Sequence, residues 1–114
     1  MKYITRAALL LVWATSALAH SPLQATTPAD GAAIAQAPSE IVLDFKGNIR
    51  LTRVTVAHAD QPGADLDLGE VSGFRAGYAL PMAPMGAGTY VIEWRGLGDD
   101  GHPMNGAFSF TVED

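Results

Sequence analysis

The sequence predicts a small all-β domain, a Greek-key β-barrel or sandwich of about seven short strands. The first observation is the repeated alternation of apolar and polar residues, which is typical of half-buried strands. The second is the spacing of turn residues, since glycine, proline, asparagine and aspartate recur at intervals of roughly 8–12 residues. The third is that no long helical pattern follows residue 19. A chain of this length is sufficient for one domain with a single hydrophobic core.

The first nineteen residues are expected to be a secretory signal peptide. Two basic residues precede the apolar run Ala7–Trp13, and Ala17–Ala19 has the small residues of a cleavage site. The apolar run is too short to span a bilayer, so no membrane insertion is expected once the signal is removed. Cleavage after Ala19 would leave residues 20–114 as one periplasmic domain, with His20 as its first residue.

Seven segments are expected to be strands. Alternation is clearest in Glu40–Lys46, after which Gly47-Asn48 is expected to end the strand. Ala32–Pro38 is small and apolar, and is expected to be a connector or one helical turn. The predicted strands are Gln24–Thr27, Glu40–Lys46, Leu51–Ala59, Leu66–Val71, Tyr78–Leu80, Thr89–Arg95 and a last one ending at Val112. Two apolar stripes are expected to face each other in the core: Tyr90, Ile92 and Trp94, and Phe108, Phe110 and Val112.

Composition excludes several classes of partner and chemistry. The domain after residue 19 has five basic and twelve acidic residues, a formal net charge of −7. Nucleic acids and anionic membrane surfaces bind basic faces, so neither is an expected partner. The chain has no cysteine, which excludes disulfides, thiolate metal sites and cysteine catalysis. An acidic exported domain is suited to binding cations.

Asp100, His102 and Pro103 form the most informative motif in the sequence. Asp100 and His102 are two residues apart, so in an extended backbone both side chains point to one face. The proline favours that extended state for the residue before it. A carboxylate and an imidazole on one face are half of a metal site. As the first residue of the domain, His20 would add two nitrogens, its α-amine and its ring Nδ1, to the same ion.

Three nitrogens and one oxygen favour Cu(II). A tetragonal arrangement of nitrogen and oxygen donors is typical of this ion, which also has the highest affinity in the divalent series. Zn(II) could bind the same groups but prefers a tetrahedron. The expected ligands are His20, Asp100 and His102, with one Cu(II) ion per chain.

Four segments of the chain match the pattern of a known family. They are the His20 start, Thr27–Ala32 (TPADGA), Gly88–Trp94 (GTYVIEW) and the closing run Asp100–Val112, which contains the Asp-x-His motif. In combination they resemble the CopC family of periplasmic copper-binding proteins. The resemblance implies a small Greek-key β-barrel, immunoglobulin-like or cupredoxin-like, with Cu(II) held at one end by His20 and the Asp-x-His motif. It also implies a non-enzymatic monomer for copper resistance and homeostasis, which sequesters copper or passes it to a CopD-like inner-membrane importer.

Two segments depart from that family's pattern. Many relatives have an acidic residue after the strand that matches Glu40–Phe45, whereas this chain has Lys46-Gly47-Asn48, so no further acidic ligand is expected there. Some relatives have a methionine-rich loop that binds Cu(I), and the corresponding loop of this chain has only Met82 and Met85. Together with Met104, these methionines are expected to be core or rim residues.

Two other functions stay open at this point. A histidine bound through its amine and ring, with a second histidine, is also the histidine brace of copper monooxygenases. A carboxylate in the copper plane would, however, occupy the position that oxygen needs. A metal-free immunoglobulin-like interaction module is the other alternative. Reductant-dependent oxidation of a substrate would favour the first, and a melting temperature indifferent to copper would favour the second.

Overall fold

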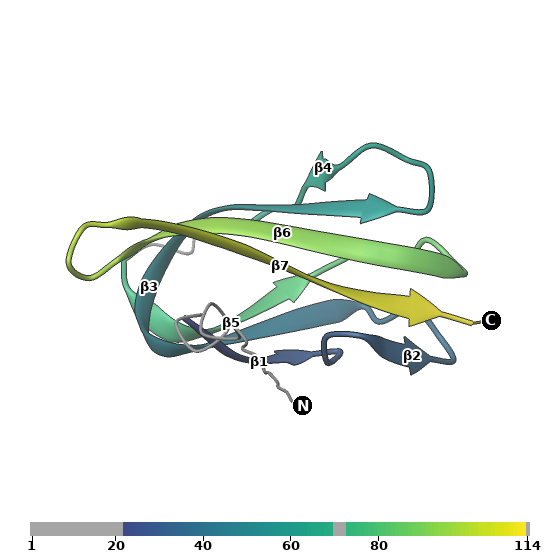
Figure 1. Ribbon diagram of the computed structural model, residues 1–114. Helices are drawn as coiled ribbons and strands as arrows, with labels where there is room; N and C mark the ends of the chain where they lie inside the picture. Colours follow the sequence, from purple (N-terminus) through teal and green to yellow (C-terminus); the bar gives the residue numbers. More distant parts are fainter. Residues whose placement is uncertain (1–21, 70–72, 114) are drawn as a thin grey trace, which may run out of the picture.

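The computed structural model describes residues 22–69 and 73–113, and its seven strands confirm the predicted all-β fold class (Figure 1). The predicted signal peptide and His20 lie outside the described residues. Within those residues, no helix is long and apolar enough to cross a membrane. The strands are β1 (Leu23–Thr27), β2 (Ala32–Ile34), β3 (Glu40–His58), β4 (Ala64–Asp65), β5 (Arg75–Pro81), β6 (Gly88–Gly98) and β7 (Pro103–Val112).

The long strand β3 runs through both halves of one curled sheet, a half-barrel (Figure 1). Its first part pairs with β1 and β5, and its second part pairs with β6 and β4. The prediction that Gly47-Asn48 ends a strand was therefore wrong. These exposed residues bend β3 without ending it, because Lys46 N–H donates to the Pro22 carbonyl at 2.8 Å and pairing resumes at Ile49.

The short strand β2 corrects the expectation of a connector or helical turn at Ala32–Pro38. It lies parallel to the end of β7, with Ala32 opposite Phe110. The turn before it is held against the same strand, since Gly31 N–H donates to the Ser109 carbonyl and Asp30 Oδ1 accepts from Ser109 N–H. Gly31 has a φ of +83°, a left-handed conformation that favours glycine. The hydrogen bonds of this turn therefore position Ala32 beside β7, where β2 begins to pair with it.

The segment between β3 and β5 differs from the predicted strand Leu66–Val71. The described part of that range, residues 66–69, is not a strand, and residues 70–72 lie outside the described residues. Pairing instead occurs just before it, where β4 lies opposite Thr55 and Val56. Leu66 and Leu68 are half-buried and pack against the core, as expected for their apolar side chains. β5 begins at Arg75, earlier than the predicted Tyr78, because its pairing with β3 extends through Gly77.

The core lies between the two halves of the sheet. The predicted facing stripes are confirmed, since Ile92 lies opposite Phe108 and Tyr90 opposite Phe110. The rings of Tyr90 and Phe110 are stacked with centroids 5.0 Å apart. The Trp94 indole meets the Phe45 ring edge-on at 4.9 Å. The buried residues are Ile41, Leu43, Phe45, Ile49, Leu51, Val54, Val56, Tyr78, Leu80, Met82, Tyr90, Ile92, Trp94, Phe108, Phe110 and Val112.

Candidate metal centre

The turn between β6 and β7 carries the Asp-x-His motif. The two strands pair up to Leu97 and Pro103, which leaves a short hairpin turn at residues 99–102. Gly98 N–H donates to the His102 carbonyl at 2.9 Å, and Gly101 N–H donates to the Gly98 carbonyl at 2.9 Å. Gly101 has a φ of +86°, so a side chain there would strain the turn. Backbone hydrogen bonds and the left-handed Gly101 therefore define the conformation of the turn.

Within this turn, Asp100 and His102 face each other. Asp100 Oδ1 accepts from the His102 backbone N–H at 3.1 Å, and Oδ2 lies 2.9 Å from His102 Nδ1. The hydrogen bond from the His102 backbone, followed by the one from its side chain, lowers the pKa of Asp100 below its ordinary value. The carboxylate is thus held ionised, as a metal ligand must be.

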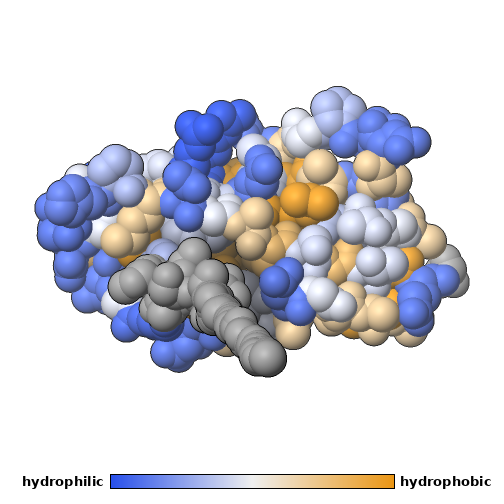
Figure 2. Space-filling model, viewed as in Figure 1, coloured by the Kyte–Doolittle hydropathy of each residue, from blue (hydrophilic) through white to orange (hydrophobic). Residues whose placement is uncertain are grey.

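The donor atoms of this pair have a spacing that a metal ion could bridge. Two donors about 2.0 Å from one ion, at right angles to each other, are about 2.8 Å apart. The 2.9 Å between Asp100 Oδ2 and His102 Nδ1 is close to that value. Both side chains are exposed, 58% and 78%, so an ion could reach them from solvent. Figure 2 shows hydrophilic residues gathered over this end of the molecule.

Two donors do not complete a copper site. No group of three or more histidine, cysteine, aspartate or glutamate side chains could hold a metal ion within the described part of the chain. The third predicted ligand, His20, lies outside that part. The nearest described residue is Pro22, whose carbonyl accepts from Lys46 N–H next to the bend of β3. β1 begins on the side of the molecule where β3 bends and the hairpin turn lies (Figure 1).

Comparison with known proteins identifies the family. The CopC domain family matches residues 23–113. This chain belongs to the CopC family. Copper resistance protein C of Escherichia coli is 32% identical over 130 residues, covering 98% of this chain and 96% of the relative. Copper resistance protein C of Pseudomonas syringae pv. tomato is 29% identical over 120 residues, covering 97% and 94%. The resemblance predicted from the sequence is thereby confirmed.

Solved structures of CopC proteins share the fold. CopC from Methylosinus trichosporium OB3b superposes with a TM-score of 0.68 at 22% identity, covering 82% of this chain and 94% of that one. PcoC, a methionine-rich copper resistance protein from Escherichia coli, gives a TM-score of 0.55 at 28% identity, covering 80% and 96%. The curled sheet described above is thus the CopC β-barrel fold, as the sequence predicted.

Three other described side chains of this CopC chain that could bind a metal, those of His58, Met82 and Met85, lie away from the turn. His58 is half-buried at the end of β3, and its Nε2 atom lies 2.7 Å from the Ala87 carbonyl oxygen. Its ring lies 4.5 Å from that of Tyr90. Met82 is in the core, 4% exposed, whereas Met85 is 40% exposed in the loop before β6. These residues do not add donors to Asp100 and His102.

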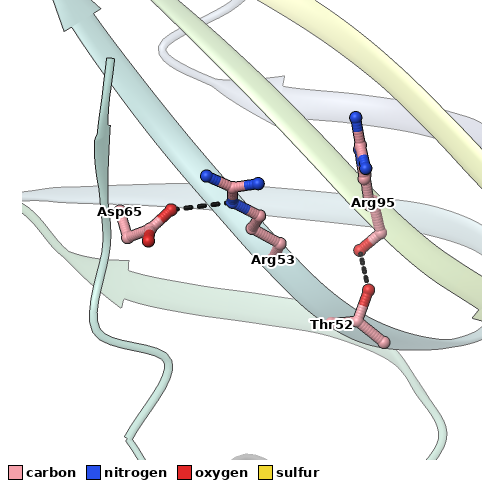
Figure 3. Close-up of polar contacts among 4 residues, drawn as sticks. All are labelled: Thr52, Arg53, Asp65 and Arg95. Atoms are coloured by element: carbon pink, nitrogen blue, oxygen red, sulfur yellow. Dashed lines mark hydrogen bonds and ion pairs between the residues drawn. The ribbon is translucent and has the colours of Figure 1, made fainter.

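A groove lined in part by Arg53 and Arg95 is a separate polar feature of the sheet. Figure 3 shows two polar contacts that these residues make. Arg53 Nε donates to Asp65 Oδ1 at 2.8 Å, which ties the β4 segment to β3. The Thr52 hydroxyl donates to the Arg95 carbonyl at 3.2 Å on the neighbouring strand. The residues that line the groove include neither Asp100 nor His102. It is therefore distinct from the candidate metal centre.

The ion pair between Arg53 and Asp65 is expected to contribute little to stability. Arg53 and Asp65 are 56% and 64% exposed, so water and salt screen their attraction. Replacing Asp65 with asparagine should leave the melting temperature of the metal-free protein nearly unchanged. Thermal unfolding followed by circular dichroism, with Arg53→Gln as the matched variant, measures this. A fall of more than about 5 °C in both variants would show that the pair holds β4 in place.

Proposed function

We propose that this CopC chain binds one Cu(II) ion through His20, Asp100 and His102, and serves copper resistance and homeostasis in the periplasm without catalytic turnover. The observation that carries the proposal is the Asp100–His102 pair. Its donor atoms are 2.9 Å apart on an exposed turn of defined shape. The names of the curated relatives, Copper resistance protein C, support the same function.

The position of Pro22 supports His20 as the third ligand. Two peptide units separate His20 from Pro22, a reach of about 7 Å before the length of the side chain is added. The Pro22 carbonyl accepts a hydrogen bond from Lys46 N–H. Three residues further along β3, Ile49 pairs with Gly98. Gly98 in turn lies two residues before Asp100. Pro22, the first described residue, is therefore held against β3, the strand that pairs with the one leading into the turn.

The exposure of the pair also bears on how copper would be exchanged. A ligand from another protein can approach an ion held by exposed side chains and replace the donors one at a time. This is suited both to sequestration in the periplasm and to transfer to a CopD-like importer in the inner membrane. The predicted signal peptide, with cleavage after Ala19, would deliver the domain to that compartment.

A Cu(II) titration with electron paramagnetic resonance tests the proposed function. The protein is the mature chain that begins at His20, compared with its Asp100→Asn and Asp99→Asn variants. Asp100 is hydrogen-bonded to His102, whereas the side chain of its exposed neighbour Asp99 makes no hydrogen bond or ion pair with the described residues. We expect Asp100→Asn to weaken Cu(II) binding about tenfold or more, and Asp99→Asn to leave it unchanged. The wild-type spectrum should be tetragonal, with couplings to nitrogen.

The His102→Ala variant completes this test, because it removes the imidazole and with it one nitrogen coupling from the spectrum. We expect it to lose tight binding and to change the nitrogen couplings. Weakly bound copper that is indifferent to both Asp100 and His102 would contradict the proposal and favour an interaction module. Reductant-dependent oxidation of a substrate by the copper-loaded chain would instead favour the histidine-brace enzyme.

A further inference from the structure

Gly98 leaves a space that two side chains share. A Cβ atom at this position would lie 2.9 Å from Asp100 Oδ1, 3.1 Å from Met104 Cε and 3.6 Å from Met104 Sδ. Because these distances are measured from one point, the sulfur and the carboxylate oxygen can be no further apart than the sum of 3.6 and 2.9 Å. Because Gly98 has no side chain, the Met104 thioether can lie next to the Asp-x-His turn.

Met104 differs from the other described methionines in its neighbours. Met82 lies in the core and Met85 is exposed in the loop before β6, at the other end of that strand. Met104 is half-buried, packs against the rim of the core, and pairs with Gly96 across the hairpin. Among these three, it alone lies beside Asp100, one of the proposed copper ligands.

The chemistry of a thioether differs from that of the other donors. Carboxylate and imidazole groups suit Cu(II), whereas the soft sulfur of methionine selects Cu(I). In trigonal blue-copper sites methionine is a weak, distant axial ligand of copper, so a thioether beside the N/O donors need not prevent binding of the oxidised ion. A site with all three types of donor can hold copper in either oxidation state.

We propose that Met104 forms, together with Asp100 and His102, a site that binds Cu(I) as well as Cu(II). The inference rests on the proposed function and deepens it. The Met104 sulfur binds the reduced ion, which arrives as Cu(I) and is held without any electron transfer within the protein. The same end of the sheet then takes up copper whether the periplasm supplies it oxidised or reduced.

Anaerobic competition with a chromophoric Cu(I) chelator tests this inference. The mature chain is compared with Met104→Leu and with the matched control Met85→Leu, whose side chain is exposed and far from the turn. Leucine has nearly the volume of methionine, so the variant keeps its packing. We expect Met104→Leu to bind Cu(I) about tenfold more weakly, with Cu(II) binding changed less than about threefold. Met85→Leu should match the wild type for both ions.

X-ray absorption of the Cu(I)-loaded chain gives an independent readout. A sulfur neighbour at about 2.3 Å is expected in the wild type and should be lost in Met104→Leu. Equal Cu(I) affinity in the two proteins, or no sulfur neighbour in the wild type, overturns the inference. The proposed function fails separately, when the mature chain and its His102→Ala variant bind Cu(II) equally well. The two failures are therefore distinguishable.

Discussion

Adding one residue in front of His20 is expected to weaken Cu(II) binding by about 100-fold, because it removes the His20 α-amine, one of the proposed ligands. The extension converts the α-amine into an amide, whose nitrogen has no free electron pair to donate. The chelate between that amine and ring Nδ1 is lost, although every side chain of the proposed site is kept. Competition with a Cu(II) chelator of known affinity measures the change for the mature and extended chains side by side.

The extended chain also provides its own control. Its metal-free melting temperature should equal that of the mature chain, because the first described contact is made by Pro22, beyond the altered position. A second chain in which the added residue is removed by a protease should regain full affinity. Equal Cu(II) affinity before and after removal would exclude the amine as a ligand, and would leave Asp100 and His102 to bind copper with other donors.

Replacing Gly106 with alanine is expected to lower the stability of the metal-free domain by about 2 kcal/mol, because the core has no room for a methyl group there. Gly106 lies opposite Trp94 in the β6–β7 pairing. A Cβ atom would lie 2.8–2.9 Å from three atoms of the indole ring, closer than side chains pack. Trp94 is 1% exposed and packs against Phe45, so it cannot move aside freely.

The loss corresponds to about 10 °C in melting temperature for a domain of this size. Gly47→Ala is the matched control, since a Cβ atom at this exposed position has no neighbour within 4 Å. Trp94 fluorescence should shift in Gly106→Ala and stay unchanged in Gly47→Ala. A Gly106→Ala protein as stable as the wild type would show that the indole can shift within the core.

Sequence reasoning succeeded where a local pattern decides the structure. Strict alternation in Thr89–Arg95 predicted both the strand and its buried face, because side chains alternate along any strand. Asp100 and His102 were predicted to share a face on an extended backbone. Their side chains do meet, with Nδ1 and Oδ2 2.9 Å apart, but on a turn in which Gly101 has a φ of +86°, so the reason given was wrong. Their role as copper ligands stays a prediction.

The errors concern features that depend on distant residues. β2 exists because Asp30 and Ser109, 79 positions apart, are hydrogen-bonded, and no local pattern in Ala32–Pro38 indicates that contact. β3 continues through Gly47 because partners on other strands hold the chain on either side. The position of the Met104 side chain over Gly98 also depends on the register of the hairpin. A glycine two residues before the aspartate was the one sequence signal available for it.

The continuity of β3 has a consequence for how the domain opens. We expect the two halves of the sheet to unfold together, because both pair with the same strand, residues 40–58. Partial unfolding from one end would have to break the backbone hydrogen bonds that β3 makes near its bend. Amide protons along both arms of β3 should therefore exchange with deuterium at similar, slow rates, as one cooperative unit. Copper held at the proposed site would then be released by ligand exchange at the turn and not by unfolding of half of the domain.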